Sequence, residues 1–593
     1  MSPTSRSKPE SDTENARDTG VPPGPIELWH QTFRELLDGI GRSTDPFGVT
    51  APIVHAQLAW ASHPKELADR LVSLSSDLWR LQQHAVNRLL GLPAPDPVPV
   101  TEGDQRFADP AWTDLPTFDL MKERYLAFTR HTQDMLYDTP GMSEKDRERA
   151  AFWWRNWLNA VAPTNWLFTN PVALRKAMET HGESLVRGFR NFLDDLRAGD
   201  VRMTDPDDFR VGENLATTPG AVVMRNRLLE LIHYAPTQAT VHAQPVVIVT
   251  PWINKFYVLD LAPKKSMIRF LLDQGLDVFI TSWKNPDADL RDVTFDDYLL
   301  EGVHAAVETA RALTGADKVH AVGYCIGGTA LAMYMAWANR RFAPDEVPVA
   351  DWTLLTTLTD FRSPGEIEVF IDEASVRSLC EAMAQKGYLD GKEMAASFRL
   401  LRANSLIWNY VVNGWLYGET PPPFDVLYWN MDSTRMPQAM HGWYLRELYL
   451  HNRLVQPDAL TVAGEPLDLR RIVQPLYAVA AEDDHIAPWR EALRIHRHVS
   501  GERRFVLSSS GHILGIVNPP VDPPKRSFRA SPVEASDRAD HWHAAHAATP
   551  GSWWTDWMDW LKPRAGERVD ARPAATADFP ELAPAPGVYV LER

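Results

Sequence analysis

A single cysteine, Cys325, lies in the segment GYCIGG (323–328), between the apolar stretch KVHAV and the helix-forming stretch TALAMYMAWANRR. The pattern G-x-C-x-G is that of a nucleophile elbow in which cysteine replaces serine, and its neighbours must be small because the turn from strand to helix is tight. The backbone N–H groups at the start of a helix stabilise a thiolate. The sequence therefore predicts a nucleophilic thiol at Cys325. A small thiol packed in a tight turn is the alternative.

An elbow nucleophile needs an acid and then a base later in the chain. Asp484 follows the apolar stretch PLYAVA and His512 follows RRFVLS, so we expect both in loops at the ends of strands. Asp483 could also supply the carboxylate, and His485 could be taken for the base. We expect His512 to be the base, because a side chain on the next loop can reach over the elbow more easily than a neighbour of the acid.

Two backbone amides are expected to bind the negative charge that develops on the attacked carbonyl oxygen. One is the N–H of Ile326, directly after the nucleophile. The other comes from the loop PWINKFYVLDL, which follows the stretch PVVIVT, and there Trp252 and its neighbour Ile253 are the candidates. An ordinary turn between a strand and a helix is an equally good interpretation of that loop.

Short β-rich stretches alternate with helical ones around these residues, which indicates a parallel sheet covered on both faces. Between about residues 360 and 470 the alternation is interrupted by a long segment rich in Trp and Tyr. An insertion there would lie over the carboxyl ends of the strands, so we expect a cap; a packed helical layer without a gating role is the alternative. The β-rich stretches begin at Pro245, Asp277, Lys318, Asp351, Pro475 and Arg503.

The chain before residue 213 has a different character. Residues 1–25 are polar and are expected to be disordered. From 26 to 212 the pattern is mainly helical, and we expect a separate N-terminal domain, followed by a catalytic domain over 213–593 with its cap insertion at about 360–470. Two apolar faces stand out in the N-terminal domain, and the second is either packed or a docking surface for a partner. They consist of Trp29, Phe33, Leu36, Leu37 and Ile40, and of Leu67, Leu71, Leu74, Leu78 and Leu81.

Composition excludes several classes of protein. The 593 residues carry a formal net charge of −17 at pH 7, whereas a general nucleic-acid binder needs a basic surface. The two cysteines exclude a disulfide framework and a cysteine-rich metal site. The first twenty residues lack the apolar core of a secretory signal, and no stretch approaches the roughly 18 apolar residues that span a bilayer. We expect a cytoplasmic protein.

Several segments of the chain resemble those of the class I polyhydroxyalkanoate (poly-3-hydroxybutyrate) synthases. GYCIGGT is similar to the lipase-like box of that family, EDDHIAPW to its acid segment and SGHILGIVNPP to its base segment. Further similar segments run from about residue 105 onward and include PTNWLFTNPVAL, WNYVVNGWLYGETPPPFDVLYWN and GVYVLER. The resemblance implies an α/β-hydrolase fold with a cap or lid insertion, preceded by a mainly helical N-terminal domain.

The resemblance also implies roles for individual residues. Cys325 would be the nucleophile, Asp484 the acid and His512 the base. Some class I members carry a cysteine where this chain has Trp252, which affects the shape of the substrate entrance but not the chemistry, since only a backbone amide is required there. The residues expected to support the site or line it are His485, Ile253, Trp429 and Tyr324.

The reaction implied is polymerisation of (R)-3-hydroxyacyl-CoA, chiefly 3-hydroxybutyryl-CoA, with release of CoA through a covalent thioester on Cys325. A thioesterase or a polyester depolymerase on the same fold is the alternative. The resemblance further implies a homodimer at the surface of polyhydroxyalkanoate granules, with granule-associated proteins as partners and no metal or redox cofactor. The sequence leaves open the monomer's side chain, the basic residues that bind CoA, and whether Asp484 or His512 activates the attacking hydroxyl.

Overall fold

The computed structural model describes residues 50–98, 100 and 104–593, so the predicted tail and the apolar face from Trp29 to Ile40 lie outside the described residues. The chain divides into two compact units. The first runs through Met203 and also includes Arg402–Pro421, although that segment falls within the predicted cap. The second consists of Thr204–Leu401 and Pro422–Arg593.

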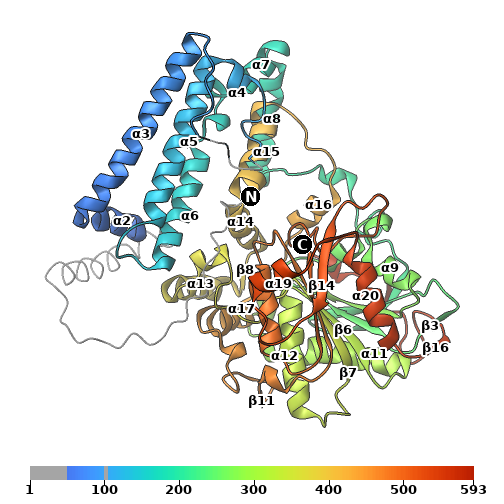
Figure 1. Cartoon of the computed structure of the whole chain (residues 1–593). Coiled ribbons are helices and arrows are strands. Elements are labelled where there is room, and N and C mark those ends of the chain that lie inside the picture. The colour runs from blue at the N-terminus through green and yellow to red at the C-terminus, as the bar shows by residue number, and fades with distance from the viewer. Residues whose placement is uncertain (1–49, 99, 101–103) are drawn as a thin grey trace, which may run out of the picture. The chain divides into compact units, whose positions relative to one another are not determined.

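Helices build the described part of the first unit (Figure 1). α3 lies beside α5, and α5 lies beside α6. A proline occupies the start of both α3 and α5, where its missing N–H costs nothing and its fixed φ favours the helix. Within residues 50–98, 100 and 104–593, none of the helices combines the length and the apolar character that crossing a membrane requires. The main helices are α2 (Thr50–Ser62), α3 (Pro64–Leu89), α5 (Pro116–Tyr137), α6 (Glu144–Ala160), α7 (Pro171–Glu179) and α8 (Glu183–Ala198).

The leucine stripe of α3 is only partly covered. Leu81 is buried, and Leu67 and Leu74 are half-buried. Leu71 and Leu78 remain 51% and 53% exposed. Packing inside this unit therefore accounts for one end of the stripe, and a docking role for the rest stays a prediction.

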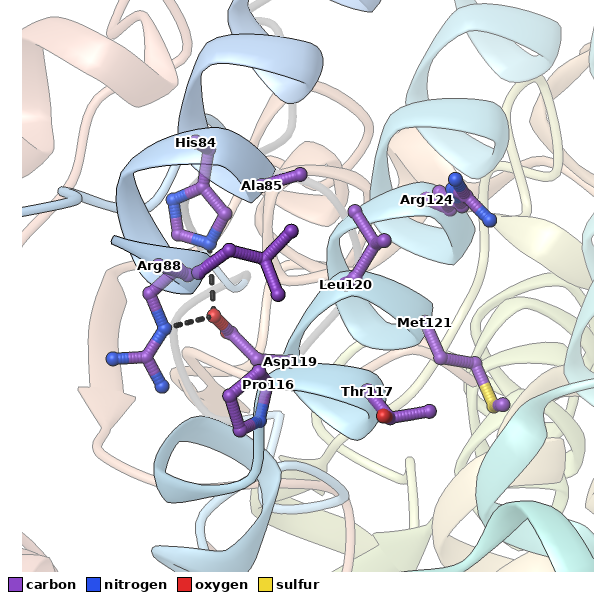
Figure 2. A pocket seen from close by; sticks show the side chains of 10 residues that line it. His84, Ala85, Arg88, Pro116, Thr117, Asp119, Leu120, Met121 and Arg124 are labelled. Carbon is purple, nitrogen blue, oxygen red and sulfur yellow. Dashed lines mark hydrogen bonds and ion pairs between the residues drawn. The ribbon is translucent and has the colours of Figure 1, made fainter. Parts of the chain in front are cut away.

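A buried ionic cluster joins α3 to α5 (Figure 2). His84 Nε2 and Arg88 Nε, both from α3, each lie 2.8 Å from Asp119 Oδ2 on α5. Lys122 Nζ lies 3.3 Å from Asp119 Oδ1 and 3.1 Å from Glu123 Oε1. Because buried charges are tolerated only when they are paired, this cluster fixes how the two helices face each other. A pocket of about 310 Å³ lies beside it.

A mixed sheet forms the centre of the second unit, with the strand order β15-β14-β13-β12-β7-β6-β4-β5-β2-β1-β17. Its six middle strands are parallel, and the strands at both edges are antiparallel. Each of the six β-rich stretches of the sequence forms one of these parallel strands. They are β4 (Val246–Val249), β5 (Val278–Trp283), β6 (Val319–Tyr324), β7 (Val349–Leu355), β12 (Leu476–Ala481) and β13 (Arg503–Ser508).

Helices cover both faces of this sheet, as Figure 1 shows. The π-helix η7 (Tyr298–His304), α11 (Ala305–Thr314) and α12 (Ile326–Arg341) pack on one face. α9 (Met267–Asp273) and α20 (Trp553–Leu561) pack on the other. Strands buried on both faces explain why the sequence shows continuous apolar runs here rather than alternation.

The long insertion follows β7, as expected. The part of it that belongs to the second unit carries α13 (Glu373–Lys386), α14 (Gly391–Leu401), α16 (Asp425–Met431), α17 (Gln438–Tyr444) and the π-helix η11 (Leu445–Leu450). Apolar side chains of α13, α17 and η11 join the same core as α12. The predicted parallel sheet with helices on both faces and a long insertion is therefore confirmed.

Candidate active site

Cys325 occupies the turn between β6 and α12, with φ 53° and ψ −124°. This positive φ is strained for a residue with a side chain, as the geometry of a nucleophile elbow requires. The N–H of Cys325 donates to the carbonyl of Leu355, 2.9 Å away at the end of β7. The thiol is half-buried and stands at the start of a sixteen-residue helix.

The small residues around Cys325 are required by close approach. A Cβ on Gly323 would lie 2.5 Å from the Cα of Gly328. A Cβ on Gly327 would lie 2.4 Å from the carbonyl oxygen of Val249, at the end of β4. A Cβ on Gly328 would lie 2.0 Å from Thr357 Oγ1. The close packing of β6, α12 and β4 at this point therefore requires the glycines of GYCIGG.

His512 and Asp484 are in direct contact, although 28 residues separate them in the chain. His512 Nδ1 lies 2.6 Å from Asp484 Oδ2, and both side chains are buried. Asp484 Oδ1 accepts hydrogen bonds from the N–H groups of Ile486 (2.8 Å) and Ala487 (2.9 Å). Asp483, the other carboxylate considered from the sequence, is exposed.

Electrostatics couple this pair to Cys325. Burial by itself lowers the pKa of His512, but the charges of Asp484 and Cys325 and the side-chain hydrogen bonds to both raise it to about 10. The imidazole is therefore protonated at neutral pH and donates to Asp484. Asp484 and His512 thus form a hydrogen-bonded pair, and the pKa of His512 depends also on Cys325.

Tyr324 packs directly against this pair. Its ring stacks on that of His512, with 5.7 Å between the centroids and 24° between the planes. Its hydroxyl donates to the main-chain oxygen of His512 at 3.4 Å. Burial, and then the charges of Cys325 and Asp484, raise the pKa of Tyr324 well above its usual value, so the hydroxyl keeps its proton.

The amides expected to bind an oxyanion lie on two adjoining segments. Ile326 is the first residue of α12, where N–H groups have no partner inside the helix and carry the positive end of its dipole. Trp252 and Ile253 follow β4, and the indole of Trp252 is buried against Tyr298 and Trp283. The close approach of Gly327 to Thr250 brings the start of this loop against the start of α12.

Two further predicted residues have clear positions. Trp429, on α16, is buried, and its Nε1 donates to the carbonyl of Lys255 at 2.6 Å, so it contacts the same loop as Trp252. His485 is half-buried in the turn after Asp484. The histidine that contacts the Asp484 carboxylate, at Oδ2, is His512.

Aromatic residues of the insertion form a cluster that the charge of Cys325 influences, and no individual member of it was singled out from the sequence. The charge of Cys325 contributes, after burial, to the raised pKa values of Tyr444 and Tyr449. Their rings lie 5.4 Å apart, and Phe361 lies 4.8 Å from Tyr449. Residues five apart share a face only where the helix is wound as a π-helix, as in η11, so a search at α-helical spacing misses this pair.

One group of side chains in the described part of the chain has the spacing of a metal site. His84, Asp96 and Asp119 offer ligand atoms within 4.8 Å of one another, in the first unit. Arg88 and Lys122 already pair with Asp119, so the carboxylate is neutralised without an ion. The expectation that no metal or cofactor takes part in the reaction stays a prediction.

Comparison with known proteins gives concordant matches. Residues 103–271 match the family described as "Poly-beta-hydroxybutyrate polymerase (PhaC) N-terminus", and residues 245–519 match the α/β-hydrolase fold. Poly(3-hydroxyalkanoate) polymerase of Methylorubrum extorquens is 41% identical over 91% of this chain and 89% of its own. Poly(3-hydroxyalkanoate) polymerase subunit PhaC of Cupriavidus necator is 42% identical over 82% of this chain and 83% of its own. The predicted α/β-hydrolase fold is confirmed.

Proposed function

This chain belongs to the family of poly(3-hydroxyalkanoate) polymerases, and from that premise we propose that it polymerises (R)-3-hydroxyacyl-CoA, chiefly 3-hydroxybutyryl-CoA, through a covalent thioester on Cys325. Membership of the family makes the chain an acyltransferase. The observation that carries the finer proposal is the buried Asp484–His512 pair, coupled electrostatically to Cys325 at a strained elbow.

The first step is acyl transfer to the thiol. His512 holds the proton of Cys325, and the thiolate attacks the thioester carbonyl of the substrate. The new C–S bond forms, the C–S bond to CoA breaks, and the departing CoA sulfur takes the proton from His512. Exchange of one thioester for another is nearly thermoneutral, so the enzyme must mainly lower the barrier. The amide of Ile326 at the start of α12 would stabilise the oxyanion, together with one from the loop after β4.

The second step makes the polyester. The hydroxyl of another acyl group attacks the thioester on Cys325, its proton passes to His512, and Cys325 leaves as the thiolate. We assign this proton transfer to His512 rather than to Asp484. Both carboxylate oxygens of Asp484 already accept hydrogen bonds, and its side chain is fully buried. Asp484 therefore orients the imidazole and stabilises its charged form.

An enzyme of this kind must keep water from the acyl-enzyme, because water competes with the attacking hydroxyl. The aromatic side chains of Phe361, Tyr444 and Tyr449 pack together in the insertion, and the charge of Cys325 acts on both tyrosines, so we assign this water-excluding role to them. Because these rings are bulky, we expect the enzyme to prefer monomers with short side chains. A thioesterase or depolymerase would instead need a path for water to reach the same carbonyl.

We further propose that the chain acts as a homodimer in the cytoplasm, at the surface of polyhydroxyalkanoate granules and with granule-associated proteins as partners. The exposed apolar residues of the first unit, such as Leu71 and Leu78, are compatible with such a surface. Sedimentation with and without substrate would test the dimer: a monomer under both conditions would contradict it.

The experiment that tests the function is product analysis. Purified protein is given 3-hydroxybutyryl-CoA, and free CoA and high-mass polyester are measured together. We expect both from the parent protein and from Cys380→Ser, and neither from Cys325→Ala. Free 3-hydroxybutyrate as the sole product would identify a thioesterase, and polymer made by Cys325→Ala would refute the nucleophile.

A further inference from the structure

Four consecutive residues of the loop after β4 are bound, three of them through their carbonyl groups. Thr434 Oγ1 donates to the carbonyl of Trp252, and Thr434 N–H donates to the carbonyl of Ile253 at 3.2 Å. Asn254 forms an isolated β-bridge with Ser433. Trp429 Nε1 donates to the carbonyl of Lys255. The segment 429–434 therefore binds residues 252–255 of this loop.

The hydrogen bond from Thr434 to the carbonyl of Trp252 determines the direction of the next amide, that of Ile253. In a trans peptide group, the C=O of one residue and the N–H of the next point in opposite directions. Because Thr434 Oγ1 holds the carbonyl of Trp252, the N–H of Ile253 is turned away from Thr434. The N–H of Trp252 belongs to the preceding peptide group, which Thr434 does not hold. Of the two oxyanion donors considered from the sequence, Ile253 is thus the one whose direction is fixed.

The side chain of Lys255 anchors the loop as well. Its side chain is only 4% exposed. Its Nζ lies 2.9 Å from Asp432 Oδ1 and donates to the carbonyl of Glu592 at 2.7 Å. Asp432 Oδ2 in turn accepts a hydrogen bond from Tyr257 at 2.9 Å. A buried ammonium is stable only with such partners, so the loop cannot shift without breaking a buried charge pair.

Glu592 belongs to a segment that is itself firmly bound to the sheet. The N–H groups of Val588 and Tyr589 donate to Glu230 Oε2, on β2 (Leu229–Tyr234), at 2.9 and 3.0 Å. Gly587 adopts φ 82°, and a Cβ there would lie 2.3 Å from the same oxygen. The N–H of Asn285, just after β5, donates to Glu592 Oε2 at 3.2 Å. The segment therefore provides a fixed point for Lys255.

We propose that Lys255 is a positioning residue: through Asp432 and the carbonyl of Glu592 it fixes the loop after β4 so that the N–H of Ile253 binds the oxyanion formed at Cys325. The segment 587–592 then serves catalysis and not only stability. This inference rests on the proposed acyl transfer. Lys255, Asp432 and Thr434 would then act on the reaction only through the loop that they hold.

Two reactions of the Cys325 thiol differ in whether they form an oxyanion. Attack on a thioester passes through an oxyanion, whereas alkylation by iodoacetamide displaces iodide at a saturated carbon and forms none. Loss of one oxyanion donor costs about 10²–10³ in rate, and misdirecting it costs part of that. A variant that only loosens the loop should therefore lose acylation and keep alkylation, whereas damage to the elbow or to His512 should impair both.

The test uses the full chain in a Cys380→Ser background, so that Cys325 is the one alkylated thiol. Lys255→Met and Thr434→Val are compared with Thr434→Ser, which keeps the hydroxyl, and with Lys264→Met, which removes an exposed lysine from the same region. The rate of the first CoA release from 3-hydroxybutyryl-CoA and the rate of alkylation by iodoacetamide are measured for each.

We expect Lys255→Met and Thr434→Val to lower the acylation rate by about 10- to 100-fold, with alkylation at the parent rate and both controls unchanged. Acylation at the parent rate in both variants would overturn the positioning role. Equal losses in acylation and alkylation would also overturn it, because they would show general damage to the site. If the parent itself releases no CoA, the proposed function fails first, and this inference fails with it.

Discussion

His512 Nδ1 and Asp484 Oδ2 lie 2.6 Å apart, with both side chains buried beneath the elbow that carries Cys325. A carboxylate in this position makes the imidazolium the stable form of His512. In the proposed reaction, a proton of this imidazolium would be the one that the departing CoA sulfur takes. The same contact links the stability of the fold to pH.

Stability should fall with rising pH because of His512. Its pKa is about 10 in the folded protein, above the value of about 6.5 for an unperturbed histidine. The folded state thus binds the proton more tightly, and the contribution is complete below pH of about 6.5 and is lost as the pH rises through about 10. Thermal unfolding of the parent and of His512→Gln from pH 6 to 10.5 checks this: the difference should shrink across that window. A difference that grows with pH would contradict the raised pKa.

The two histidines near Asp484 should respond differently to substitution. His512→Gln removes the proton carrier, so the acylation rate should fall by about 10²–10⁴. His485→Gln should retain acylation, because Asp484 Oδ2 is hydrogen-bonded to His512. Stopped-flow measurement of the first CoA released distinguishes them, and the reverse pattern would exchange their roles.

Gly327→Ala should damage the elbow by overpacking. Its new methyl group would meet the carbonyl oxygens of Val249 and Thr250 at 2.4 and 2.6 Å, and backbone cannot move aside cheaply. We expect a loss of about 1–3 kcal/mol in the free energy of unfolding, with loss of acylation. Gly414→Ala is the control, since nothing lies within 4 Å of its Cβ position, and it should be neutral or stabilise by up to about 1 kcal/mol. Urea titration measures both, and equal stabilities would refute the clash.

Tyr449 should limit the size of the monomer's side chain. Its ring lies close to those of Tyr444 and Phe361 in the insertion, and the charge of Cys325 contributes to its raised pKa. Tyr449→Ala should raise kcat/KM for 3-hydroxyhexanoyl-CoA relative to 3-hydroxybutyryl-CoA by about tenfold or more, since one or two methylene groups contribute that much in an apolar pocket. Tyr449→Phe keeps the ring and should keep the ratio. An unchanged ratio in the alanine variant would remove Tyr449 from the specificity surface.

Asp119 should be essential to the first unit. Asp119→Asn removes the carboxylate that Arg88 and the buried Lys122 share. Because Lys122 keeps Glu123 as a partner, we expect a loss smaller than that of a fully unpaired buried charge, which is about 3–5 kcal/mol. Hydrogen exchange should accelerate in α3 and α5, whereas Asp114→Asn, at an exposed site, should leave it unchanged. Stabilisation of the parent by added divalent cations would instead point to ligation by His84, Asp96 and Asp119.

The sequence by itself determined the sheet and the order of the chemical groups. Six apolar stretches specify six parallel strands because strands buried on both faces need continuous apolar residues. The elbow could also be predicted from the sequence, because its tight packing admits only glycine at positions 323, 327 and 328. The positions of Asp484 and His512 follow from the strands that end before them.

Only the tertiary structure decided which neighbours act together. Asp483 and Asp484 look alike in the sequence, and the backbone turn that aims one of them at His512 is a matter of three-dimensional geometry. Tyr444 and Tyr449 meet because a helix is wound as a π-helix, and Lys255 reaches Glu592 across 337 residues of chain. Periodicity describes a segment and its own faces. Contacts between distant segments depend on how the elements pack, and that packing fixes the pKa of His512 and the direction of the Ile253 amide.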